Sequence, residues 1–343
     1  MADLPVIDLT GLRDGTDAPG VARRIDDACR RVGFFVVRGH GVDPAVPRRL
    51  DALGRAFFAL PDDEKAAIAM ARGGPAWRGW FPLGGELTAG EADGKEGLYL
   101  GEHLGPEDPR VVAGWPLHGP NLYPQRPAGL ADAVRAYLDA VTPLGHLVLR
   151  GMARGLGLDP DWFARHLTAE PLVMLRLFHY PPVPAGDDRW SVGEHTDYGL
   201  VTLLWQDDAG GLEVRGPDGW QAVPPEPDAF VVNLGDMLER MTAGAYRSTP
   251  HRVRNASGAD RLSIPLFLDP ALDADVRPVP GLAPDRPADD EDDDERWDGR
   301  SVHGWSGTYG DYLVAKVRRV FPALGDAVLD GEVAGGAGPV AAG

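Results

Sequence analysis

Residues 172–180 read LVMLRLFHY, a run of apolar and β-branched side chains that suits a buried strand. Six more short runs of this kind follow, and glycine, proline, aspartate and asparagine separate them. They cover residues 200–206, 212–215, 220–223, 229–234, 251–254 and 261–268. Many short strands with frequent turns are typical of an all-β sandwich or jelly roll. The second half of the chain is therefore predicted to be a β-domain of that kind.

The first half of the chain has the spacing of helices. Apolar residues recur at helical intervals over 21–32, 44–71 and 130–158, and Pro143 is expected to kink or split the last of these. Residues 308–321 predict one more helix near the end of the chain. Helices first and strands later indicate a mainly β protein with flanking helices.

Composition excludes several classes of protein. The 343 residues include one cysteine, so a disulfide framework and a cysteine-based zinc site are excluded. The net charge is −18, which disfavours binding to nucleic acid or to an anionic membrane surface. The start of the chain lacks a signal-peptide pattern, and no apolar run approaches the ~18 residues of a membrane span. We expect a cytoplasmic protein with a small-molecule partner; the sequence does not indicate an oligomeric state.

One short motif offers metal ligands. His195 and Asp197 lie in EHTDYGLVTLL, at the start of a predicted strand, where residues i and i+2 point to one face. His251, in STPHRV, is a third ligand of the right type. Two histidines and one carboxylate form the donor set of non-haem Fe(II) oxygenases. A His-x-Asp pair alone is common by chance, and the same three residues could also hold zinc in a hydrolase.

A second motif lies ten residues after His251. Arg261 and Ser263 open the strand RLSIPLF and share a face by the same period of two. A guanidinium fork beside a hydroxyl can hold a carboxylate with two hydrogen bonds. A strand-edge ion pair is the simpler interpretation of Arg261, but a zinc hydrolase would leave both residues without a role.

These motifs resemble those of a known family. HTD, HRV and RLS stand in the order found in the isopenicillin N synthase-like family of Fe(II)/2-oxoglutarate-dependent dioxygenases, and the chain looks like a bacterial-type member. Further similar blocks run along the whole chain: LPVIDL (4–9), ACRRVGFFVVRGHGV (28–42), FFALPDDEK (57–65), WRGWFPLGGE (77–86), KEGLYLG (95–101), NLYPQRPAGL (121–130), LFHYPP (177–182) and VVNLGDMLERMTAGAYRSTPHRV (231–253).

The resemblance implies a fold. It is a double-stranded β-helix, or distorted jelly roll, with a helical N-terminal buttress. The expected organisation is one integrated globular unit, with an N-terminal dioxygenase region at 1–125, buttressing helices at 126–170 and the catalytic β-helix at 171–272. An acidic loop and a C-terminal helix would follow at 273–327, and a disordered tail at 328–343.

The resemblance also implies a site. His195, Asp197 and His251 would hold Fe(2+), while 2-oxoglutarate and O2 would serve as co-substrates. Arg261 and Ser263 would bind the distal carboxylate of 2-oxoglutarate, with the hydroxyl of Tyr180 joining them. The chain departs from many plant members at Phe178, where an asparagine lies near the co-substrate. Asn233 and Asp236 are expected only to cap the turn before DMLERMT.

The reaction implied is oxidation of a small organic substrate by hydroxylation, desaturation or cyclisation, with release of succinate and CO2. Two alternatives stay open: a family oxidase that does not use 2-oxoglutarate, and a non-catalytic protein that binds small acids. Composition typical of a GC-rich bacterial genome allows a role in secondary metabolism. Four aromatic residues are candidates for the substrate pocket, namely Trp80, Phe81, Trp205 and Phe267. Packing in the core is the alternative for Phe267 and is favoured for Trp205. Aromatic residues of two further segments, 73–105 and 277–306, are expected at its mouth or as loop anchors, including Trp77 with the cation Arg78, Trp297 and Trp305.

Overall fold

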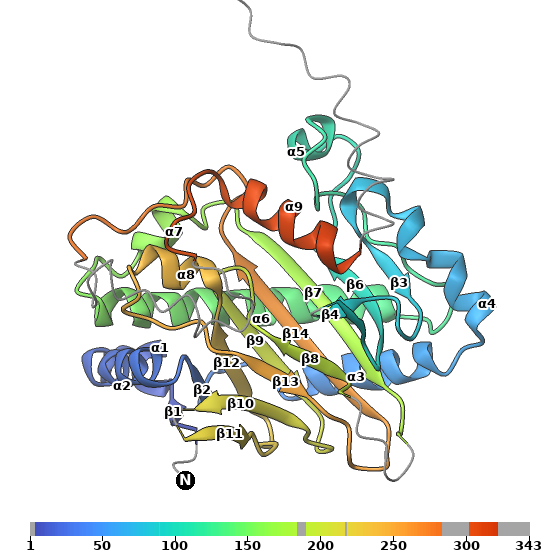
Figure 1. The fold of residues 1–343 in the computed structure, drawn as a ribbon, viewed down its shortest axis with the longest axis horizontal. Helices are drawn as coiled ribbons and strands as arrows, with labels where there is room; N and C mark the ends of the chain where they lie inside the picture. The colour runs from blue at the N-terminus through green and yellow to red at the C-terminus, as the bar shows by residue number, and fades with distance from the viewer. Residues whose placement is uncertain (1–3, 89, 184–189, 217, 283–301, 322–343) are drawn as a thin grey trace, which may run out of the picture.

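Two β-sheets and a layer of helices make up the protein in a computed structural model that describes residues 4–88, 90–183, 190–216, 218–282 and 302–321 (Figure 1). The larger sheet has eight strands in the order β1-β2-β12-β9-β14-β7-β6-β3, and the smaller has four in the order β11-β10-β13-β8. Both sheets are open, and a cavity between them is lined by side chains from each. The architecture is the jelly roll that the sequence predicts.

The strands of the larger sheet are β1 (Val6–Asp8), β2 (Phe34–Arg38), β3 (Gly79–Phe81), β6 (Glu96–Gly101), β7 (Leu172–Tyr180), β9 (Val201–Gln206), β12 (Phe230–Leu234) and β14 (Arg261–Asp269). Those of the smaller sheet are β8 (Val192–His195), β10 (Leu212–Gly216), β11 (Gly219–Ala222) and β13 (His251–Val253). A separate two-stranded hairpin joins β4 (Leu87–Thr88) to β5 (Glu91–Ala92). All seven predicted runs after residue 170 are strands.

The α-helices are α1 (Thr10–Arg13), α2 (Ala18–Arg31), α3 (Ala45–Phe58), α4 (Asp62–Lys65), α5 (Pro109–Val112), α6 (Leu130–Gly155), α7 (Trp162–His166), α8 (Asp236–Met241) and α9 (Tyr309–Val320). Three short 3-10 turns, Ala66–Ile68, Met70–Arg72 and Gly74–Ala76, follow α4. In the part of the chain that is described, no helix is long and apolar enough to cross a membrane.

Helix α6 supports the larger sheet from behind (Figure 1). It packs against α2 and α3, and Gly151 lets α2 come close, because a Cβ there would lie 2.5 Å from the Ile25 side chain. Pro143 lies inside α6, which continues on both sides of it. Of the expected kink or split at Pro143, the split is therefore wrong, since packing on two neighbouring helices compensates for the missing backbone donor.

Helix α9 closes the cavity on the opposite side. Its N-cap is Thr308, where the Thr308 hydroxyl accepts from the Asp311 amide and the Asp311 carboxylate accepts from the Thr308 amide. Its far end brings Val317, Val320 and Phe321 to the cavity wall. The fixed start of the helix thus places these apolar side chains. The acidic run 289–295 and the tail 328–343 lie outside the described residues.

Candidate active site

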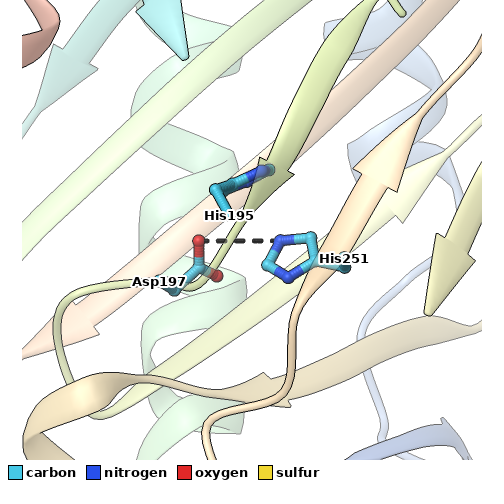
Figure 2. Close-up of side chains that lie close together, drawn as sticks. All are labelled: His195, Asp197 and His251. Carbon is cyan, nitrogen blue, oxygen red and sulfur yellow. Dashed lines mark ion pairs between the residues drawn. The ribbon is translucent and has the colours of Figure 1, made fainter. Parts of the chain in front are cut away.

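Three side chains converge between the two sheets (Figure 2). His195 is the last residue of β8 and His251 the first of β13, and the two residues are paired directly across these antiparallel strands. Their ring centroids are 4.2 Å apart. Asp197 Oδ1 lies 3.8 Å from His251 Nε2, and one ligand atom of each residue lies within 4.8 Å of the others. The structure thus brings together the three predicted ligands.

The route to this arrangement differs from the expected one. His195 ends a strand instead of starting one, and Asp197 lies beyond it in a turn. A backbone bridge to Gly235 holds this turn, and the Asp197 carbonyl accepts from the Asp236 amide at 2.8 Å. Asp197 is therefore held beside the histidines by a backbone contact that is distant in sequence.

Both imidazoles are held in one orientation. Nδ1 of His195 lies 2.9 Å from the Gly193 carbonyl, and Nδ1 of His251 lies 3.2 Å from the Thr249 carbonyl. Because a carbonyl oxygen only accepts hydrogen bonds, each Nδ1 carries the proton and each Nε2 keeps its lone pair. Burial lowers the pKa of both histidines, which keeps them neutral near neutral pH. They are set up as metal ligands.

The Asp197 carboxylate is also fixed by neighbours. Its Oδ2 accepts from Asn233 Nδ2 at 2.6 Å and from the Thr202 hydroxyl. Asn233 on β12 and Thr202 on β9 face each other across the sheet. The expectation that Asn233 only caps a turn is wrong. The sequence did indicate a special role, because Asn233 is the one polar residue in the apolar run FVVNL. Thr202 is likewise the one polar residue in VTLLW.

A cationic group lies at one end of the same cavity. Arg261 is 1% exposed, and its Nε donates to the Gly210 carbonyl at 2.6 Å while its Nη2 donates to Gln206 Oε1 at 3.1 Å. Its Nη1 is buried without a hydrogen-bond partner. Ser263 and Tyr180 line the cavity beside it, with their hydroxyl oxygens 3.4 Å apart. Arg261, Ser263 and Tyr180 therefore form the cluster that the motif suggested.

Only one of the four expected pocket aromatics lines the cavity. Phe267 does so, on the face of β14 that also carries Arg261 and Ser263. On β9, Thr202 and Leu204 face the cavity, so Trp205 points the other way.

Trp80 and Phe81 lie behind the wall. The Trp80 indole donates to Glu96, and the Phe81 ring is covered by edge contacts from Tyr99 and Phe321. These aromatics belong to the hydrophobic core.

The rest of the wall is lined partly by residues expected at the mouth and partly by residues that the sequence did not indicate. Trp77 and Arg78 line it, as expected for the mouth, while Trp305 packs on Tyr312 and Trp297 lies outside the described residues. Sequence analysis missed several further lining residues, among them Glu86, Lys95, Tyr99, Met174, Arg176 and Tyr198. Which of these residues come together depends on the order of strands in the sheet, and that order is not evident from the sequence.

The residues present fit both groups that the motifs imply. Two neutral imidazole nitrogens and one carboxylate oxygen are the donors that Fe(II) takes in facial sites. The unpartnered Arg261 Nη1 and the Ser263 hydroxyl are donors that a carboxylate would satisfy.

Two family models match the chain. Residues 171–270 match the 2OG-Fe(II) oxygenase superfamily, and residues 4–126 match the non-haem dioxygenase in morphine synthesis N-terminal region. The chain belongs to the isopenicillin N synthase-like family of 2-oxoglutarate/Fe(II) oxygenases. It is an enzyme of the dioxygenase class, and Fe(II) and 2-oxoglutarate are the cofactor and co-substrate of that family.

Relatives of this oxygenase carry different names. A probable iron/ascorbate oxidoreductase from Dictyostelium discoideum is 41% identical over 95% of this chain and 97% of the relative. A 1-aminocyclopropane-1-carboxylate oxidase from the same organism is 34% identical over 93% and 95%. A crystal structure of a Neurospora crassa protein in complex with alpha-KG and thymine superposes with a TM-score of 0.75 at 26% identity, over 92% of this chain and 96% of that one. The class is shared, and the substrates differ.

Proposed function

We propose that this oxygenase oxidises a small organic substrate by hydroxylation, desaturation or cyclisation, with 2-oxoglutarate converted to succinate and CO2. The observation that carries the co-substrate assignment is Arg261, which lines the cavity that holds the histidines and Asp197 and whose buried Nη1 lacks a partner. A buried guanidinium nitrogen without an acceptor costs free energy, and a carboxylate removes that cost.

Each group has a defined task in this proposal. His195, Asp197 and His251 would hold Fe(II) through two imidazole nitrogens and one carboxylate oxygen. Arg261 and Ser263 receive the distal carboxylate of 2-oxoglutarate, and Tyr180 buttresses the Ser263 hydroxyl. The bound iron and co-substrate supply the oxidising power for the substrate C–H bond when O2 is present. The chain itself positions these groups and, with its apolar wall, keeps water away from them.

Phe178 takes the place where many plant members have asparagine. It lines the cavity opposite Ser263 on the neighbouring strand, and Lys95 Nζ lies 4.8 Å from its ring. One polar contact to the co-substrate is thus replaced by an apolar ring, and the carboxylate grip of Arg261 and Ser263 is left intact.

Succinate formation tests the proposal. Wild-type protein loaded anaerobically with Fe(II) is given 2-oxoglutarate and O2, and succinate is measured without any added substrate. We expect slow uncoupled turnover in the wild type. Arg261→Ala should raise the KM for 2-oxoglutarate by about 10- to 100-fold, because it removes the charged hydrogen bonds to the carboxylate.

Arg165→Ala is the matched control, because Arg165 is exposed and pairs with Asp159 far from the cavity. It should leave the KM unchanged. Fe(II) binding is measured on all three proteins, so that loss of the metal is not mistaken for loss of the co-substrate. An unchanged KM in Arg261→Ala would contradict the assignment.

The similarity to a 1-aminocyclopropane-1-carboxylate oxidase favours one second candidate. In a family oxidase that does not use 2-oxoglutarate, Arg261 and Ser263 would hold a carboxylate of another molecule. Iron bound by His195, Asp197 and His251 without any succinate would favour this alternative.

A further inference from the structure

Two other arginines face the cavity at a distance from Arg261: Arg78, just before β3, and Arg176, on β7. Arg78 is 2% exposed; its Nη2 donates to the Leu117 carbonyl at 3.0 Å, and its Nε has no partner. Arg176 Nη1 is also buried without a partner, and its Nη2 reaches only the weak acceptor Met174 Sδ, at 3.7 Å. Among the described residues, no carboxylate forms an ion pair with either arginine. Two cations thus share one wall, and each has a buried donor without an acceptor.

Glu86, a carboxylate in this wall, already has partners. Glu86 Oε2 lies 2.9 Å from Lys95 Nζ, and Glu86 Oε1 accepts from the Tyr99 hydroxyl. Lys95 also contacts the buried Asp93 carboxylate. One lysine and two carboxylates sum to −1, and the two arginines add +2. Asp269 also lines the cavity, and burial raises its pKa to about 7, so this end of the cavity carries +1 while Asp269 is neutral. A monoanion balances that charge, whereas a dianion would leave a buried excess of −1.

Arg176 is also held in a geometry that suits an anion. Its guanidinium carbon lies 3.6 Å from the Tyr99 ring centroid and 5.0 Å from that of Phe267. A guanidinium stacked on aromatic faces keeps its edge free to donate two parallel hydrogen bonds. Burial, together with the nearby charge of Arg176, lowers the pKa of Arg78 to about 9, as expected for a cation that lacks a partner.

This second cationic group is separate from the co-substrate end. Arg261 pairs across the strands with Tyr180, and Arg176 lies four residues before Tyr180 on β7. Four residues of strand span about 13 Å, so the two arginines belong to two different ligands. Besides these charged groups, the cavity wall is lined by apolar side chains, among them Trp77, Leu100, Leu117, Val317 and Phe321.

We propose that Arg176, backed by Arg78, binds the carboxylate of the primary substrate, which is a small monocarboxylic acid with an apolar body. This inference rests on the proposed function, because it assumes that Arg261 is occupied by 2-oxoglutarate. The Glu86 carboxylate lies in the same wall and repels a second negative charge on the substrate, because Lys95 is shared between Glu86 and Asp93.

Binding of matched acids and amides tests the inference. The full-length protein, with Fe(II) and 2-oxoglutarate under nitrogen, is titrated with phenylacetate, 3-phenylpropionate and 4-phenylbutyrate and with the three corresponding amides. Calorimetry and tryptophan fluorescence report binding, since Trp77 lines the cavity. We expect at least one acid to bind about 10- to 100-fold more tightly than its amide. Arg176→Leu should remove this preference, and Arg176→Lys should keep part of it.

Arg72→Leu is the control, because Arg72 is exposed and is not part of the cavity wall. It should bind acids like the wild type. If Arg176→Leu fails to fold, Arg176→Lys and the wild-type acid-to-amide ratio still decide. Equal binding of every acid and its amide, or an unchanged preference in Arg176→Leu, would overturn the inference. Succinate formed without added acid is measured in parallel on the wild type, so a failure of the co-substrate assignment is seen separately.

Discussion

The polar groups at the iron end of the cavity have hydrogen-bond partners within the protein, whereas several donors at its β6–β7 end have none. At the iron end, carbonyl groups fix both imidazoles, and Asn233 and Thr202 fix the Asp197 carboxylate. At the β6–β7 end, Arg78 and Arg176 have buried donors with no acceptor. The part that performs the shared chemistry is complete in the protein alone, whereas the other part is completed by its ligand.

The largest effect should come from removing the only anionic ligand. Asp197→Ala leaves two neutral imidazoles, so we expect at least a ~100-fold loss of Fe(II) affinity and no measurable succinate. Anaerobic equilibrium dialysis with Fe(II) measures the affinity. Asp159→Ala removes an exposed carboxylate instead and should bind Fe(II) normally. Normal Fe(II) affinity in Asp197→Ala would mean that the metal binds elsewhere.

An intermediate effect should follow loss of the groups that orient Asp197. Asn233→Ala removes the 2.6 Å hydrogen bond to Oδ2, and Thr202→Val removes the other donor while keeping the shape of the side chain. Partners of metal ligands typically account for about 10- to 100-fold in metal affinity or activity. We expect a loss in that range for Asn233→Ala, measured by the same dialysis. If both variants bind Fe(II) like the wild type, the iron end is not preorganised as described.

The smallest effect concerns stability at the far end of β14. Burial raises the pKa of Asp269 from its ordinary 3.8 to about 7, although the Tyr309 hydroxyl donates to the carboxylate and opposes the rise. A carboxyl whose pKa is raised on folding stabilises the fold in its neutral form, and that stability is lost as the pH rises from about 4 to 7.

Asp269→Asn removes this titration. The Tm of the variant minus that of the wild type should therefore increase by roughly 2–4 °C between pH 5 and 7 and level off above pH 7. Thermal unfolding at a series of pH values measures the difference. A difference that stays constant over this range would show that Asp269 ionises normally in the folded protein.

The same contrast explains what the sequence can predict. Strand runs such as 172–180 and 261–268 were identified because a buried strand needs a continuous apolar pattern. His195, Asp197, Arg261 and Ser263 were identified because each pair is local in sequence and has few other uses.

The wall of the substrate cavity was not predicted, for a physical reason. Arg176 meets Tyr99 only because β7 lies next to β6, and no local pattern specifies that pairing. Conversely, Trp205 has an aromatic side chain at a plausible position but lies on the wrong face of β9. The hydrogen bond from Thr202 to Asp197 shows that Thr202 faces the cavity. Because side chains alternate along a strand, Trp205 then faces the other way.

The pairing of β7 with β14 has one more consequence. Both strands are central in the larger sheet, so their backbone hydrogen bonds prevent the co-substrate arginine and Arg176 from sliding relative to each other. The sheet therefore fixes the distance between the reacting centre and the anchored carboxylate of the substrate. The distance of a carbon atom from the carboxylate would then decide whether that carbon is oxidised. Lengthening an acid at its apolar end would change which molecules fit but not which carbon is oxidised.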